Sequence, residues 1–93
     1  MMDVKLIRLI TGEEIIAEVI DWSNGILTVK NGLVVIPQQG QVGFAPWATV
    51  IDPERPEIAL SMEHVIYCVE VTADVVKQYE KILVVTLSSL RSN

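Results

Sequence analysis

Two turn segments carry the side chains that are best suited to chemistry or binding. Residues 21–24 read Asp-Trp-Ser-Asn, which places a carboxylate, an indole and an amide beside a predicted turn. An indole offers a flat face on which a nucleic-acid base can stack. Residues 61–66 read Ser-Met-Glu-His-Val-Ile and place the chain's single histidine, His64, at a second predicted turn. Trp22 is therefore a candidate for contact with a base, and His64 is the second polar group that such a site could use.

Each segment also has a purely structural interpretation. Trp22 can pack at the end of a strand while Asp21 and Asn24 shape the turn that follows it. His64 can be a polar turn residue that is hydrogen-bonded to a neighbour. The sequence leaves both interpretations open.

The sequence contains few residues that could support catalysis or bind a metal ion. One histidine and one cysteine, Cys68, leave few nucleophile or metal-ligand combinations, and the common catalytic, metal and phosphate-loop motifs do not occur. Cys68 lies in an apolar run, where a buried and inert thiol is expected. Glu13 and Glu14 are expected to form a solvated turn. We therefore expect a protein that is not an enzyme, with no catalytic residue, cofactor, metal or small-molecule substrate.

The elements that must position the two turns are short strands. Runs rich in Val and Ile between residues 4 and 29 are broken at 11–14 and at 23–25, where Gly12 and Asn24-Gly25 favour tight turns. Asn31-Gly32 is either another hairpin or a bend within a strand that reaches residue 36. The predicted strands are 4–10, 15–21, 26–30, 58–62 and 65–71, with an edge strand or irregular crossing at 44–51, an exposed loop at 37–43 and a turn at 52–56.

The hydrophobic period changes from that of strands to that of a helix after residue 71. Thr72 is a plausible N-cap and Asp74 favours the first turn of the helix. Residues 82–86 are β-branched at four of five positions, which weakens helix propensity and leaves open that the helix frays or stops early there, or that the run is a strand. The helical stripe consists of Val75, Tyr79, Ile82, Leu83, Thr86, Leu87 and Leu90.

Composition indicates one domain over residues 1–93, with a sheet at 4–71 and a helix at 72–90. Hydrophobic residues make up 51% of the chain, and predicted strands are apolar on both faces, so we expect a sheet that folds over on itself and a second chain that covers the rest. The net charge of −5 argues against tight, nonspecific binding to duplex DNA. The lone cysteine and the absence of a signal or long apolar segment predict a cytoplasmic protein with no membrane contact.

The stretch from residue 9 to residue 24 resembles the first signature of the Sm/Lsm/Hfq family of ring-forming RNA-binding proteins. Its matching residues are Leu9, Gly12, Ile15, Ala17, Val19, Asp21 and Asn24. Residues 63–66 look similar to the Lys-His-Ala turn of the bacterial Hfq proteins, with His64 in place of the histidine and Glu63 in place of the lysine. The whole chain is similar to short Sm-like proteins of marine cyanophages and ocean metagenomes.

This resemblance implies a mainly β fold: a small, strongly bent antiparallel Sm-like (SH3-like) barrel of about five strands with a C-terminal helix. It implies a homo-oligomeric ring of five to seven subunits, in which the fourth strand of one subunit pairs with the fifth strand of the next. The candidate interface residues are Ile58, Leu60, Met62, Val65, Tyr67 and Val69.

The resemblance also implies a role in phage or host nucleic-acid processing, in the cytoplasm of a bacterial cell. Single-stranded RNA, or DNA, would contact Asp21, Trp22, Asn24 and His64 around the ring pore. The alternative is a structural or protein-interaction ring that binds no nucleic acid. A basic face would favour the first function, and a uniformly acidic ring would favour the second. The residues able to build a basic face are Lys5, Arg8, Lys30 and Arg55.

Overall fold

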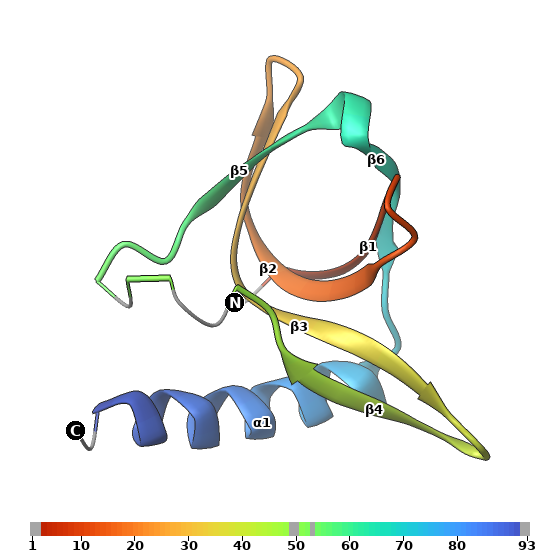
Figure 1. The fold of residues 1–93 in the computed structure, drawn as a ribbon, viewed down its shortest axis with the longest axis vertical. Coiled ribbons are helices and arrows are strands. Elements are labelled where there is room, and N and C mark those ends of the chain that lie inside the picture. The colour runs from red at the N-terminus through yellow and green to blue at the C-terminus, as the bar shows by residue number, and fades with distance from the viewer. Residues whose placement is uncertain (1–2, 49–50, 53, 92–93) are drawn as a thin grey trace.

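The computed structural model describes residues 3–48, 51–52 and 54–91, which form a mainly β domain with one C-terminal helix (Figure 1). The strands pair antiparallel in one sheet of order β4-β3-β2-β1-β6, and β5 lies beside β3. The elements are β1 (Val4–Leu9), β2 (Glu14–Ser23), β3 (Ile26–Gln38), β4 (Gln41–Pro46), β5 (Ile58–Ser61), the single-turn helix η1 (Met62–His64), β6 (Val65–Glu70) and α1 (Ala73–Arg91).

The first two turns are those that the glycines predict. Gly12 has a φ of 95° in the turn between β1 and β2. Ser23 pairs with Ile26 across a two-residue turn in which Asn24 and Gly25 have φ values of 54° and 75°. Two successive positive φ angles match the twist of the flanking strands, which explains the preference for Asn-Gly at this turn.

The long strand β3 bends at Asn31, so the interpretation of Asn31-Gly32 as a bend within a longer strand is confirmed. Asn31 has a φ of 56°, and the register with β2 shifts there, because Glu18 pairs with Lys30 whereas Ile16 pairs with Leu33. Such a bulge turns a strand sharply. β3 pairs with β5 before the bend and with β4 after it, along the same edge.

The segment 37–43 is a hairpin, and the prediction of an exposed loop there is wrong. Pro37 pairs with Val42 and Gln38 with Gln41, so the strands continue to within two residues of each other. Gly40, with a φ of 78°, supplies the turn. The described sheet has six strands, in keeping with the prediction of about five. The expected turn at 52–56 is present in part, since the backbone N–H of Arg55 donates to the carbonyl of Asp52 at 2.9 Å.

The chain itself covers both faces of the sheet around β2. The curled inner face buries Ile15 and Ala17, whereas the intervening Ile16 lies on the outer face beneath α1 with Tyr79 and Leu83. Alternate residues of β2 thus belong to two cores, which accounts for their apolar character. At Ile16 the cover is α1, and the expected second chain is not needed there.

Helix α1 begins as the sequence predicts and continues further. The backbone N–H of Val75 donates to the Thr72 hydroxyl at 3.3 Å, which confirms the N-cap. The helix runs through residues 82–86 to Arg91 because Ile82 and Leu83 pack against the sheet, and this packing outweighs their β-branched neighbours. The strand and early-stop alternatives are wrong. The side chains of Thr86, Leu87 and Leu90 lie outside the described part of the helix.

The sheet curls strongly but does not close (Figure 1). Within the described residues, β5 pairs with β3 and β6 pairs with β1, while η1 connects the two. The outer edges of β5 and β6 therefore remain without a partner strand in this part of the chain.

None of the described helices combines the length and apolarity needed to span a bilayer.

Candidate nucleic-acid interface

The two candidate turns lie at one end of the curled sheet. The backbone N–H of Met62 in η1 donates to the carbonyl of Gly25 at the tip of the β2–β3 hairpin, with a distance of 2.9 Å. On its other side, the carbonyl of His64 accepts from the N–H of Ile10 at 3.0 Å. The Ser61 hydroxyl caps η1 by accepting from the N–H of Glu63 at 3.3 Å. Backbone bonds therefore fix η1 between the first and second hairpins.

Trp22 is half exposed at the end of β2 and belongs to the inner side of the sheet. Its register partner is Leu27, which is fully buried in the inner core and pairs in turn with Leu60 of β5. Cross-strand partners share a face of the sheet, so Trp22, Leu27 and Leu60 form one row. With 50% of its surface exposed, Trp22 is available for stacking at the end of that row.

Asp21 and Ser23 lie on the opposite face of the same strand. Asp21 pairs with Thr28, and the Ser23 hydroxyl donates to a carboxylate oxygen of Asp21 at 2.7 Å. Asn24 stands at the hairpin tip, where its left-handed backbone shapes the turn. The structure thus separates the carboxylate of Asp21 from the indole of Trp22, and both Asp21 and Asn24 have a role in the turn itself.

The face that Trp22 occupies depends on a bulge that alternation alone does not reveal. Val19 pairs with Val29 and Trp22 with Leu27, so β2 carries one residue more than β3 between these pairs. Counting by twos from Val19 would place Trp22 on the outer face. The extra residue lies around Ile20, which is 44% exposed. Because of it, the side chain of Trp22 belongs to the inner face.

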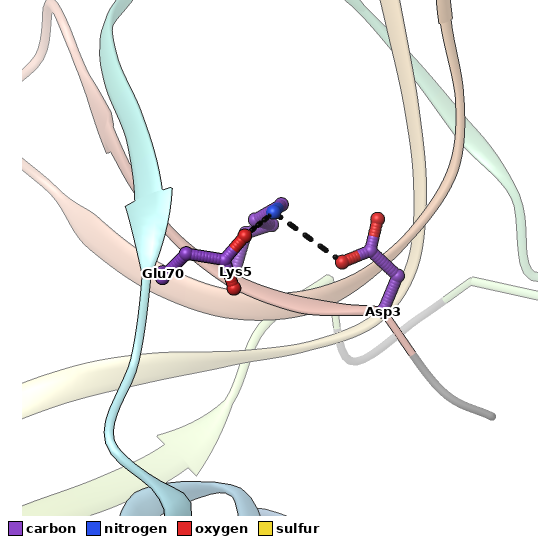
Figure 2. A network of polar contacts seen from close by, with 3 residues as sticks. All are labelled: Asp3, Lys5 and Glu70. Atoms are coloured by element: carbon purple, nitrogen blue, oxygen red, sulfur yellow. Dashed lines mark hydrogen bonds and ion pairs between the residues drawn. The ribbon is translucent and has the colours of Figure 1, made fainter.

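Two basic residues of β1, Lys5 and Arg8, are engaged by carboxylates. The ammonium group of Lys5 lies between Glu70, to which it donates a hydrogen bond, and Asp3, at 3.4 Å (Figure 2). The hydrogen bond to Glu70 raises the pKa of Lys5. Arg8 lies 3.9 Å from a carboxylate oxygen of Glu14. Two of the four cations expected to form a basic face are therefore paired with acidic groups.

The candidate ring-interface residues have mixed environments. Ile58, Leu60, Met62 and Val65 are partly buried against the inner core of their own chain. The Tyr67 hydroxyl donates to Glu14, and this hydrogen bond raises the pKa of Tyr67. Val69 is 42% exposed. Five of the six lie on β5 and β6, whose outer edges are unpaired in the described part of the sheet, whereas Met62 lies in η1, because β5 ends at Ser61.

Sequence reasoning missed Ile66, which is 57% exposed on β6. Val65 pairs with Leu9 and Tyr67 with Arg8, so Ile66 is the extra residue of a bulge. An alternating pattern cannot identify such a residue, because its side chain belongs to neither register. Ile66 adds an exposed aliphatic group beside the free edge of β6.

The surroundings of Cys68 do not favour a reactive thiol. Cys68 pairs with Ile7 and packs against the inner core, and burial raises the pKa of its thiol. A raised pKa keeps a thiol protonated and less nucleophilic. Across residues 3–48, 51–52 and 54–91, no three His, Cys, Asp or Glu side chains lie close enough together to hold a metal ion.

The fold and this site define a small β-rich domain whose curled antiparallel sheet presents an exposed indole and an exposed histidine at two connected turns. Comparison with models of known protein families finds no match, and comparison with curated proteins finds none either. Membership of the Sm/Lsm/Hfq family therefore stays a prediction from the sequence.

Proposed function

We propose that this chain is an Sm-like protein that assembles into a homo-oligomeric ring and binds single-stranded RNA or DNA. The observation that carries the proposal is the hydrogen bond between Met62 and Gly25, which joins the segment of His64 to the hairpin of Trp22. The strong bend of β3 and the pairing of β6 with β1 also support the proposal, because a sheet this small needs both to curl toward a barrel.

Stacking supplies the main attraction in this proposal. The half-exposed indole of Trp22 accepts one base, and such stacking contributes about 1–3 kcal/mol per base. His64 is exposed on η1 and contacts the same strand of nucleic acid. Lys5 and Arg8 are paired with carboxylates and the chain carries a net charge of −5, so we expect phosphate contacts to add little and binding to depend only weakly on salt.

Ring assembly uses the free edges of β5 and β6. Neither strand contains a lysine or a proline, the residues that commonly protect a sheet edge from pairing. A head-to-tail contact between β5 of one subunit and β6 of the next repeats until the ring closes. The exposed Ile66 and Val69 are buried beside that contact.

The proposal is tested by measuring the assembly mass and then fluorescence polarisation with short poly-U and poly-A at two salt concentrations. We expect an oligomer that binds at least one of the two strands and retains most of its affinity at the higher salt concentration. A stable monomer at micromolar concentration would refute the ring. An oligomer that leaves both strands unbound would refute the nucleic-acid function.

A second candidate is a structural or protein-interaction ring that binds no nucleic acid. It is favoured by the net charge of −5 and by the pairing of Lys5 and Arg8 with acidic residues, since phosphates need free cations. The same experiment separates the candidates, because this one expects the oligomer without any polarisation change.

A further inference from the structure

We propose that the β3–β4 hairpin is a second assembly surface, which pairs with the same hairpin of a second copy of this chain along the outer edge of β4. The hairpin after the bend, residues 33–46, is termed the arm. This inference does not depend on nucleic-acid binding, and it uses a different part of the molecule from the proposed β5–β6 contact.

The arm lies within the one long uncharged segment of an acidic chain. Every Asp, Glu, Lys, Arg and His residue lies outside residues 31–51, although the whole chain has a net charge of −5. Two copies of an acidic protein repel each other through their summed charge. A contact through the arm adds least to this repulsion, because the arm brings no charge of its own into the contact. The charge distribution therefore favours a second copy as the occupant.

The arm projects as a braced hairpin. At its base, Val35 pairs with Phe44, and both pack against the outer core that contains Tyr79 and Leu83. Beyond these residues the hairpin continues to a tip at Gly40 that stands clear of the curled sheet and of α1 (Figure 1). The helix thus holds the base of the arm while its outer half stays open.

Large aliphatic side chains on the outer half are exposed on both faces. Ile36 is 39% exposed and lies opposite Gly43, which has no side chain to cover it. Val42 is 51% exposed and lies opposite Pro37. Exposed aliphatic groups on both faces of a projecting hairpin are typical of a surface that is covered on assembly.

The outer edge of β4 is open to strand pairing. Within the described residues β4 pairs with β3 alone, over six residues. It contains no lysine, and its only proline, Pro46, stands at its end. Two such edges pair antiparallel about a two-fold axis, which gives a closed contact between two copies. Four strands of two arms then form one ribbon, in which Val42 of each copy is buried.

The arm and the proposed ring contact can be occupied together. β5 pairs with β3 along residues 26–29, whereas the arm begins only after the bend at Asn31. A two-fold contact through the arm therefore joins two rings, or two single chains where no ring forms. The assembled mass is then twice that of the unit that lacks the arm contact.

The test measures assembly mass by sedimentation over a wide concentration range for Val42→Lys and Val42→Glu. We expect both variants to halve the mass of the assembled form. Val42→Lys lowers the net negative charge, so a halved mass in that variant cannot come from stronger overall repulsion. Val42→Thr keeps a β-branched, uncharged residue on the edge and should retain the wild-type mass. Val84→Lys places the same charge on α1, at a position that is 63% exposed against 51% for Val42, and should also retain the wild-type mass.

Failure of this proposal is distinguishable from failure of the proposed ring. Val69→Lys acts on the edge of β6, so we expect it to break a ring into dimers held through the arm. A wild-type mass that Val42→Lys and Val42→Glu leave unchanged, with both variants folded by circular dichroism, would overturn the arm contact. If Val84→Lys halved the mass as well, the contact could not be assigned to the arm. If the assembly kept its mass only while a lipid or another protein was present, the arm would be assigned to that partner instead.

Discussion

The hydroxyl group of Tyr79 donates a hydrogen bond to the backbone carbonyl of Asn31 at 2.6 Å, which joins α1 to the bend of β3. At a bulge, a carbonyl leaves the regular ladder and needs another donor. Tyr79 is completely buried and supplies that donor from the outer face. The helix therefore stabilises the bend that separates β4 from β5 along one edge of β3.

Tyr79→Phe should lower the free energy of unfolding by about 1–3 kcal/mol, because the Asn31 carbonyl loses its donor while the aromatic packing remains. Urea unfolding followed by circular dichroism measures the change. Tyr67→Phe is the matched control, since the Tyr67 hydroxyl bonds to Glu14 at a more exposed site. Equal losses in both variants would contradict a special role for the bend.

Stability should also fall at alkaline pH because of Tyr79. Burial, and then the charge of Glu18, raise the pKa of Tyr79 above its usual value of 10.0. The folded protein then keeps a proton that the unfolded chain loses, so the contribution of Tyr79 is complete below pH 10 and declines as the pH rises above it. The limiting slope is about 1.4 kcal/mol per pH unit. Tyr79→Phe should have a shallower alkaline decline, and parallel curves for the two proteins would reject this cause.

Gly32→Ala should destabilise the protein by about 1–3 kcal/mol through overpacking. A Cβ atom at this position would lie 2.6 Å from Cε3 of Trp47, whose indole packs against the inner core. Adding Trp47→Phe removes the clashing ring atom, so the two changes together should cost less than the sum of the single changes. Thermal or urea unfolding of all four proteins measures this coupling. Additive losses would mean that the contact between Gly32 and Trp47 is not the cause.

Trp22→Ala should lower the affinity for single-stranded nucleic acid by about 1–3 kcal/mol, with a shallow salt dependence, because it removes the stacking surface. His64→Ala should weaken binding further, since η1 holds His64 beside the same hairpin. Trp47→Phe is the control for a tryptophan outside the candidate site. Binding that survives the double change Trp22→Ala and His64→Ala would exclude this site.

A lysine at Val69 should convert the proposed ring into smaller species or aggregate, because a charge would enter the β5–β6 contact. Tyr67→Pro should have the same result, because proline removes a backbone donor from β6. Size-exclusion chromatography with light scattering measures the mass. Ile10→Lys, on another exposed aliphatic residue, should leave the ring intact. An unchanged mass in both β6 variants would reject assembly through this edge.

Local signals in the sequence predicted much of the fold. The Asn24-Gly25 turn, the Thr72 cap and the helical stripe up to Leu83 all depend on neighbouring residues, and the structure contains each of them. The hairpin at 37–43 was missed because its glutamines and glycines are typical of a loop. The pairing of β3 with β4 there depends on both strands together and is not visible in the local sequence.

The candidate site was less predictable than the fold, because bulges decide which way its side chains face. One extra residue near Ile20 turns Trp22 inward and Asp21 outward, and another exposes Ile66. Neither of these two bulges carries an Asn-Gly signal like the one at residues 31–32, so only the register of the paired strands reveals them. The four residues at 21–24 therefore looked like one cluster in the sequence, whereas the structure divides them between two faces.

The ion pair of Lys5 with Glu70 joins residues that are 65 positions apart, and it has a consequence for how the chain folds during synthesis. β1 can pair with β2 as soon as the first hairpin has left the ribosome, but its second edge must wait for β6. Contacts between distant segments form slowly because a long loop must close first. The β6 edge proposed for assembly therefore comes into existence only at the end of folding, which delays assembly until each subunit has folded.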